Sequence, residues 1–189
     1  MAFASKIAVS IEETSLVPTR EPVGDLRLRI AQHVDGEDAA LGDEFLGTCE
    51  QRFRAEFGAT VVDVKEIIAT ECDVLAPCAL GAALNSGTVD SVRAKIIAGA
   101  ANNQLGTLED GDRLAQRGIL YLPDFLVNAG GIISVAREFR NEGSEEAVMA
   151  EVTQIRERVA ELMDRVAQSG VAPARVAHDW ASSLLVKPE

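Results

Sequence analysis

The chain has 189 residues, enough for one domain with a sizeable core, and its 47% hydrophobic and 25% charged residues are typical of a globular protein. A formal net charge of −12 argues against binding to a nucleic-acid backbone, which requires clustered Lys and Arg. The sequence contains no apolar run long enough for a transmembrane helix and does not begin with the pattern of a signal peptide. Its three cysteines, Cys49, Cys72 and Cys78, show no metal-ligand spacing. We therefore expect a cytoplasmic protein with no metal, nucleic-acid or membrane partner.

The N-terminal part shows the weakest pattern. Residues 6–11 are predicted to form a short strand, and residues 26–30 alternate apolar residues with Arg, which is the period of a half-buried strand. Residues 39–57 carry apolar side chains at roughly helical spacing, and Gly58 is a plausible end for that helix.

After Gly58, short apolar runs alternate with helical stretches. Strands are predicted at 59–62, 72–77, 94–98 and 119–122, and helices or helical turns at 64–69, 89–92 and 109–117. Apolar strands separated by helices predict a parallel sheet covered on both faces. We expect the strands at 73–77, 94–98 and 119–122 to be adjacent and parallel.

The C-terminal end is predicted to be helical. One helix opens at residues 128–131 and runs to about Phe139. A second begins after Ser144, a favourable N-cap, continues to about Gln168 and ends at Gly170. Pro173 starts a last helix that reaches about Leu185.

Three segments that could bind a ligand follow the predicted strands. They are 76–81 (Ala-Pro-Cys-Ala-Leu-Gly), 98–105 (Ala-Gly-Ala-Ala-Asn-Asn-Gln-Leu), and 121–124 (Tyr-Leu-Pro-Asp) leading to 128–131 (Asn-Ala-Gly-Gly). Open α/β sheets bind ligands at the carboxyl ends of their strands. Small residues let a flat ring and a ribose approach the backbone, and Asn amides both donate and accept hydrogen bonds.

The order and spacing of these segments resemble the C-terminal domain of the leucine, phenylalanine and valine dehydrogenases, in the Glu/Leu/Phe/Val amino-acid dehydrogenase family. The resemblance runs from about residue 53 to residue 185. It implies an α/β fold with an incomplete Rossmann-like parallel sheet, helices on both faces and a helical C-terminus. Residues 1–50 are expected to be an unassigned segment that is not family-like, and residues 51–189 a partial dinucleotide-binding domain with C-terminal helices.

The resemblance also implies residue roles. The expected contacts to the cofactor NAD come from the strand ends and comprise Cys78, Ala79, Leu80, Asn102, Asn103 and Asn128. Cys78, Ala79 and Leu80 would touch the nicotinamide ribose, and Asn102 would lie near the nicotinamide and the reacting carbon. Asn128 would lie near the nicotinamide carboxamide.

Two residues of the following helix, Ile132 and Val135, would line the pocket for the substrate side chain. Each site residue also has a plainer interpretation. On residue type alone, Cys78 is more typical of a small buried hydrophobic residue. Ile132 and Val135 are typical of a helix core, and Asn128 of a helix N-cap.

Features of the family's first domain do not appear in this sequence. That domain carries a lysine in a glycine-rich motif for the substrate carboxylate, then a second lysine and an aspartate for acid–base work. The phosphate-binding G-x-G-x-x-G pattern is missing too. No catalytic residue is therefore assigned, and NAD binding is expected to be weak. A truncated or rearranged gene with an unrelated 5′ end, or a frameshifted reading of it, is the simplest expectation.

The predicted function is NAD-dependent oxidative deamination of a branched-chain or aromatic L-amino acid to a 2-oxo acid and ammonia, impaired in this chain. The alternatives are a non-catalytic Rossmann-like binding or interaction module and a reductase of another substrate class. Without the first domain's cover, part of the apolar stripe from Val148 to Val166 and the helix around Trp180 are expected to be exposed. We therefore expect a homo-oligomer or self-association, unless residues 1–50 fold over the gap.

Overall fold

The computed structural model describes residues 59–78 and 81–185 with their side chains. It also describes the backbone of residues 6–12 and 27–33, together with residues 51 and 55, which are both helical. Most of the helix predicted over 39–57 therefore lies outside the described residues.

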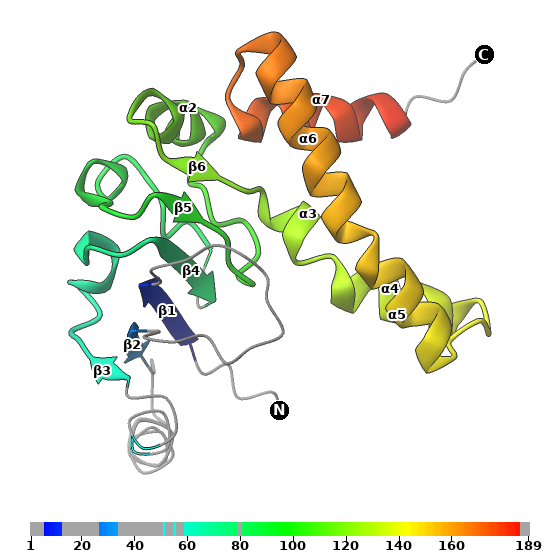
Figure 1. The fold of residues 1–189 in the computed structure, drawn as a ribbon, viewed down its shortest axis with the longest axis horizontal. Coiled ribbons are helices and arrows are strands. Elements are labelled where there is room, and N and C mark those ends of the chain that lie inside the picture. The colour runs from blue at the N-terminus through cyan, green and yellow to red at the C-terminus, as the bar shows by residue number, and fades with distance from the viewer. Residues whose placement is uncertain are drawn as a thin grey trace.

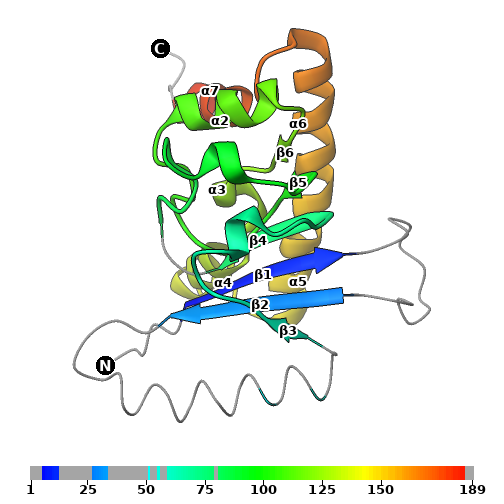
Figure 2. The same cartoon turned by 90° about the vertical axis from the view of Figure 1, so that its left-hand side faces the viewer.

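The described strands form one sheet in the order β3-β2-β1-β4-β5-β6. Figure 2 shows them stacked from β6 at the top to β3 at the bottom. Their bounds are β1 Lys6–Glu12, β2 Arg27–His33, β3 Thr60–Val61, β4 Val74–Cys78, β5 Ile96–Ile97 and β6 Leu120–Tyr121. β4 pairs in parallel with β5, and β5 in parallel with β6. The prediction of three adjacent parallel strands is confirmed, within a fold of the α/β class.

The centre of the sheet differs from the expectation of a Rossmann-like order with its centre missing. β1 occupies that place and runs antiparallel to both β2 and β4, so the sheet is mixed. β2 in turn pairs in parallel with β3. Residues before position 50 thus supply two strands of the same sheet. A period-two apolar pattern predicts a strand but not its direction, which only the pairing partner decides.

Helices and helical turns follow the strands, as Figure 1 shows. They are η1 Ile67–Ala69, η2 Val89–Ser91, α2 Leu108–Gln116, α3 Asp124–Val127, α4 Gly130–Phe139, α5 Glu145–Thr153, α6 Ile155–Ser169 and α7 Pro173–Leu185. The predicted caps are present, since the Ser144 side chain accepts a hydrogen bond from Ala147 N and Gly170 ends α6 with φ 67°.

The single helix predicted from Ser144 to Gln168 is two helices, α5 and α6, with the break at Gln154. The hydroxyl of Thr153 donates to the carbonyl of Met149, one turn earlier, at 2.7 Å. Back-bonding of this kind bends helices. In Figure 1, α5 and α6 form a long arm beside the rest of the molecule.

The core lies where the parallel strands meet α2, η2 and α7. It is almost entirely aliphatic and consists of Cys72, Leu75, Leu84, Val89, Val92, Ala94, Ile97, Leu114, Ile119, Tyr121 and Ala174. α7 is held against α2 by Arg175, which donates to both carboxylate oxygens of Asp112. These contacts make the parallel strands a rigid support for the loops that follow them.

The stripe from Val148 to Val166 is only partly covered, and Leu184 and Leu185 on the helix of Trp180 are 74% and 84% exposed. Leu162 is buried and the other members are partly buried, as is Trp180. The physical reason is that α6 packs against α3 and α7, and α5 against α4. The exposed large apolar side chains of the helices after β6 are Phe125, Ile132, Val135, Phe139, Met149, Leu184 and Leu185.

Candidate functional site

The carboxyl ends of β4, β5 and β6 meet at one edge of the sheet because the three strands are parallel and adjacent. Backbone hydrogen bonds extend the pairing beyond the strands. Ala101 N donates to Pro77 O at 2.9 Å, and Leu122 N donates to Ile97 O at 2.9 Å. The three segments singled out in the sequence are therefore one contiguous surface.

Three of the predicted site residues come together on this surface. The side-chain nitrogen of Asn128 donates to the carbonyl of Ala100 at 2.7 Å and to Oδ1 of Asn102 at 3.2 Å. The backbone N–H of Ala100 lies 3.5 Å from the sulfur of Cys78, which accepts its hydrogen bond. Ala100 thus links Cys78 to Asn128, and Asn128 bonds directly to Asn102.

Asn103 contributes backbone rather than side chain to this arrangement. Its φ of 53° lies in the left-handed region. Its N–H donates to Oδ2 of Asp124 at 2.8 Å, and its carbonyl accepts from Ala82 N at 2.6 Å. The turn at Asn103 is held from two sides, and neither Asp124 nor Ala82 had been assigned a role from the sequence.

Gln104 is a second residue that sequence reasoning missed. It is fully buried, and its side-chain nitrogen donates to the carbonyls of Gly99 at 2.7 Å and Ala101 at 2.9 Å. Both bonds close the loop that carries Asn102. Its Oε1 has no hydrogen-bond partner among the described residues. The only available signal was its place at the end of the Asn-Asn segment.

Glycines allow the loops to approach each other. A Cβ on Gly81 would lie 3.1 Å from the carbonyl oxygen of Asn102 and 3.2 Å from that of Asn103. One on Gly99 would lie 2.7 Å or less from the carbonyl carbon and the nitrogen of Pro77. Side chains at these positions would push the strand ends apart, so the small residues serve loop packing here.

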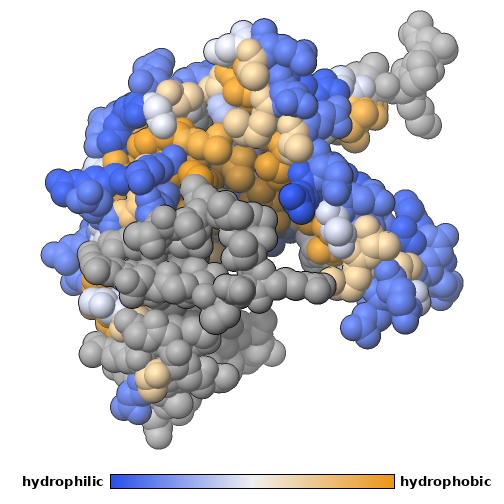
Figure 3. All heavy atoms as spheres, in the orientation of Figure 1, coloured by the Kyte–Doolittle hydropathy of each residue, from blue (hydrophilic) through white to orange (hydrophobic). Residues whose placement is uncertain are grey.

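The remaining predicted site residues divide into two groups. Ala79 and Leu80 lie outside the described residues. Ile132 and Val135 lie on α4 and are 67% and 60% exposed, so they are available to a ligand or a partner and are not core residues. In Figure 3, hydrophobic side chains gather in the middle of the visible face, over β5, β6 and α3.

Tyr121 and Asp124 form a hydrogen-bonded polar pair at this edge. The Tyr121 hydroxyl donates to Oδ1 of Asp124 at 3.0 Å. Burial raises the pKa of Tyr121 above its ordinary value of 10.0, and the charge of the neighbouring Asp124 carboxylate raises it further. Tyr121 is therefore a neutral hydrogen-bond donor at physiological pH. A pocket of about 240 Å³ lies beside this pair and is lined also by Asn103, Phe125 and His178.

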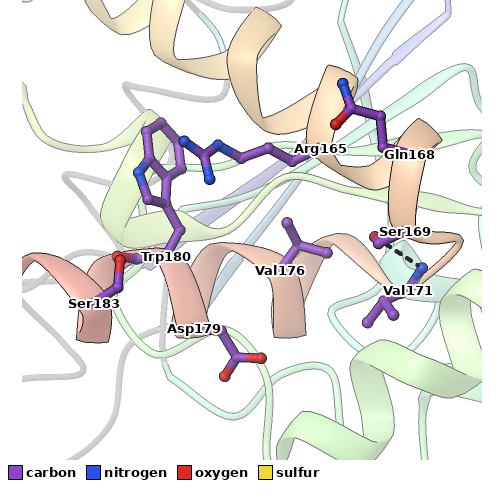
Figure 4. A pocket seen from close by; sticks show the side chains of 8 residues that line it. All are labelled: Arg165, Gln168, Ser169, Val171, Val176, Asp179, Trp180 and Ser183. Atoms are coloured by element: carbon purple, nitrogen blue, oxygen red, sulfur yellow. Dashed lines mark hydrogen bonds between the residues drawn. The ribbon is translucent and has the colours of Figure 1, made fainter.

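A second hollow, of about 510 Å³, lies between α6 and α7 (Figure 4). The guanidinium of Arg165 stands over the Trp180 ring at 4.5 Å from its centre. All of its described lining residues fall within 165–183, away from the strand ends. It is therefore separate from the Cys78–Asn102–Asn128 surface.

Two kinds of site are not found in the described part of the chain. No group of three or more His, Cys, Asp or Glu residues there is arranged to hold a metal ion. None of the helices described is both long and apolar enough to cross a membrane.

The donor set fits one end of a nicotinamide dinucleotide. Both hydrogens of the Asn128 amide are used within the protein, which leaves its Oδ1 as an acceptor. Asn102 Oδ1 accepts from Asn128, which leaves the Asn102 nitrogen as a donor. An acceptor beside a donor is complementary to a carboxamide.

The strand beside β4 does not fit the pyrophosphate in the same way. A phosphate-binding loop follows the carboxyl end of a strand, whereas β1 brings its amino end to this edge, since Ile7 pairs with Cys78.

Sequence comparisons agree with the geometry. The profile of the Glutamate/Leucine/Phenylalanine/Valine dehydrogenase family matches residues 43–182. A leucine dehydrogenase of Bacillus cereus is 39% identical over 167 residues, which cover 86% of this chain and 45% of that protein. An L-tryptophan dehydrogenase of Nostoc punctiforme is 37% identical over 168 residues, covering 85% of this chain and 47% of that protein. The chain therefore spans less than half the length of these relatives.

Solved structures show the same relation. The crystal structure of L-tryptophan dehydrogenase from Nostoc punctiforme superposes with a TM-score of 0.66 and 40% identity, over 70% of this chain and 40% of that chain. Hetero-hexameric glutamate dehydrogenase from Thermus thermophilus superposes with a TM-score of 0.50 and 25% identity, over 59% of this chain and 28% of that chain. The chain belongs to the glutamate/leucine/phenylalanine/valine dehydrogenase family.

Proposed function

We propose that this chain supplies the nicotinamide side of an NAD-dependent L-amino-acid dehydrogenase site for a branched-chain or aromatic substrate. Bound NAD supplies the acceptor for the hydride that leaves the substrate α-carbon, and hydrolysis of the resulting imine gives a 2-oxo acid and ammonia. The observation that carries the proposal is the Asn128–Asn102 hydrogen bond of 3.2 Å at the carboxyl ends of the strands.

The role of the two asparagines is orientation. The acceptor on Asn128 and the donor on Asn102 select one of the two ways in which a carboxamide can lie, and so select which face of its ring meets the substrate. Because neither amide carries a charge, this recognition adds no electrostatic bias at the reacting carbon. Cys78, Ala79, Leu80 and Asn103 are proposed to contact the same end of the cofactor.

Ile132 and Val135 are proposed to contact the substrate side chain. Their 67% and 60% exposure provides apolar surface one turn apart on α4, which suits an aliphatic or aromatic group. The relatives named leucine, phenylalanine and tryptophan dehydrogenase support this class of substrate. The carboxylate-binding and acid–base groups are proposed to come from a family first domain, and residues 51–189 to be the partial dinucleotide-binding unit.

We also infer weak NAD binding, a cytoplasmic location and a homo-oligomeric or self-associating state. Weak binding is supported by the direction of β1, because the strand beside β4 brings its amino end to this edge and the next carboxyl end on that side belongs to β2, one strand further away. Self-association is supported by the exposed apolar side chains of α4. The same surface supports the second candidate function, a non-catalytic module that docks another chain.

The test is NADH formation with Leu, Val, Phe and Trp, measured with and without a family first domain supplied in trans. Activity is expected only when both parts are present, and Asn128→Ala should reduce it by at least about tenfold because it removes the acceptor and frees Asn102. Gln116→Ala, an exposed amide on α2, is the matched control. Absence of NADH formation and of any nicotinamide contact in saturation-transfer NMR would leave the docking module as the function.

A further inference from the structure

Asp124 stands between the last strand and the proposed nicotinamide site. It is the first residue of α3 and follows β6 after Leu122 and Pro123. One carboxylate oxygen accepts from the hydroxyl of Tyr121 at 3.0 Å and the other from the backbone N–H of Asn103 at 2.8 Å. Its side chain is thus directed toward the loop after β5.

The Tyr121 bond fixes the orientation of that carboxylate. Tyr121 is 2% exposed, so its ring is held by the core on β6 and its hydroxyl has a defined place. With one oxygen engaged there, the other oxygen faces Asn103 N. The carboxylate therefore connects Tyr121, which is fixed in the core, to the backbone of the loop that carries Asn103.

Asn103 needs such a contact because of its backbone conformation. A φ of 53° is unfavourable for a residue with a Cβ, although Asn tolerates it better than most. The Asn103 turn directly follows Asn102, whose Oδ1 accepts from Asn128. If the turn relaxes, the Asn102 side chain leaves its place beside Asn128.

We propose that Asp124 is a positioning residue, which holds the left-handed turn at Asn103 and thereby keeps the Asn102 and Asn128 amides aligned for a carboxamide. This inference rests on the proposed function for the identity of the ligand. The hold on Asn103 is a property of the protein alone.

An acid in the first turn of a helix has a simpler role, which is to favour the helix dipole. The geometry distinguishes the two roles. The carboxylate bonds of Asp124 go to the Asn103 amide on another segment and to the Tyr121 side chain, not to the backbone of α3. α3 is also only four residues long, so its dipole is small.

Three variants separate these contributions. Asp124→Ala removes both acceptors. Asp124→Asn keeps an acceptor for Asn103 N, since its amide nitrogen can donate to the Tyr121 oxygen. Tyr121→Phe removes the hydroxyl and leaves the carboxylate to Asn103. A pure dipole role predicts that Asp124→Asn behaves like Asp124→Ala, whereas the positioning role predicts that it behaves like the wild type.

The first measurement is the rate of amide hydrogen exchange at Asn103 in the full chain, detected by NMR. Exchange should be about tenfold faster in Asp124→Ala, as expected for loss of one charge-assisted hydrogen bond, and within about threefold of wild type in Asp124→Asn. Tyr121→Phe should fall between the two, because it keeps the acceptor but loses the bond that orients it. If Asp124→Ala does not unfold cooperatively, Asp124→Glu replaces it, because one added methylene displaces the carboxylate. Unchanged exchange in a folded Asp124→Ala or Asp124→Glu protein would overturn the inference.

The second measurement is the affinity for nicotinamide mononucleotide, which lacks the adenosine half and so reports on this end of the site. Asp124→Ala should weaken binding about tenfold, with Asp124→Asn close to wild type. Equal binding by wild type and Asp124→Ala would overturn the role of Asp124 and leave the proposed function intact. No binding by wild type would overturn the proposed function and the ligand role of Asp124 together, while exchange at Asn103 still decides whether Asp124 holds the turn.

Discussion

Replacing Gly99 by Ala should separate the ends of β4 and β5. A Cβ at this position would lie 2.5 Å from the nitrogen and 2.7 Å from the carbonyl carbon of Pro77, and close to its oxygen as well. All three are backbone atoms, so no side-chain rotation relieves the contact. The strand ends must move instead.

The size of the effect follows from these distances. Non-bonded heavy atoms are comfortable at about 3.5 Å, so the segments must separate by about 1 Å. That displacement breaks the bond from Ala101 N to Pro77 O, which is 2.9 Å long. One lost hydrogen bond of about 1 kcal/mol, added to an overpacking cost of about 1–3 kcal/mol, gives a loss of about 2–4 kcal/mol in the free energy of unfolding. A typical domain has only about 5–15 kcal/mol in total.

Urea denaturation followed by circular dichroism measures this loss, with two glycines as matched controls. A Cβ on Gly131, in α4, meets nothing within 4 Å, so Gly131→Ala should be neutral or stabilising by up to about 1 kcal/mol. Gly118 also has open space but a φ of 73°, and Gly118→Ala should cost about 1 kcal/mol. If Gly99→Ala lies within about 0.5 kcal/mol of wild type, within the usual range for harmless surface changes, the close approach of the strand ends is wrong.

Three further predictions concern charge, burial and association. The hydrogen bonds from Arg175 lower the pKa of Asp112 below its ordinary value of 3.8, so the stability they supply is complete above about pH 4 and lost as pH falls through the lowered value. The difference in unfolding free energy between wild type and Arg175→Ala should therefore be constant from about pH 5 to 7 and shrink in more acidic urea titrations. Gln104→Leu leaves the carbonyls of Gly99 and Ala101, the second of them buried, without their donor and should cost about 1–3 kcal/mol in the same assay. Ile132→Glu combined with Val135→Glu should shift light-scattering mass toward the monomer, since both side chains are exposed apolar surface.

Each of these predictions has a control and a contrary result. Asp112→Asn should reduce the acid dependence to the part that Glu109 supplies through its own bond to Arg175. A difference that grows below pH 4 would contradict the assigned ion pair. Gln116→Leu, on the exposed face of α2, should leave stability unchanged, and equal losses in the two Gln variants would show that Gln104 has no special place. A wild-type chain that is already monomeric at micromolar concentration would contradict self-association through α4.

Local patterns in the sequence determined much of this protein. The runs at 72–77, 94–98 and 119–122 are apolar enough to predict strands of a sheet covered by helices. Their alternation with helices predicts that they are parallel, as observed. Ser144, Gly170 and Pro173 marked helix ends because capping depends on one or two neighbouring residues. The segments that follow the strands were enough to identify the family. The parallel order of the strands was enough to predict that Cys78 and Asn128 lie at one edge of the sheet.

Only the tertiary structure decided the features that depend on partners distant in sequence. The direction of β1 follows from which strands it pairs with. The stripe on α6 is partly covered because that helix lies against α3 and α7. Gln104 stabilises its own loop because its side-chain amide donates hydrogen bonds to two carbonyls of that loop. Asp124 reaches an amide 21 residues away, and no spacing in the sequence encodes that meeting. Hydrogen bonds of this kind act over about 3 Å, so they exist only after packing has brought their donors and acceptors together.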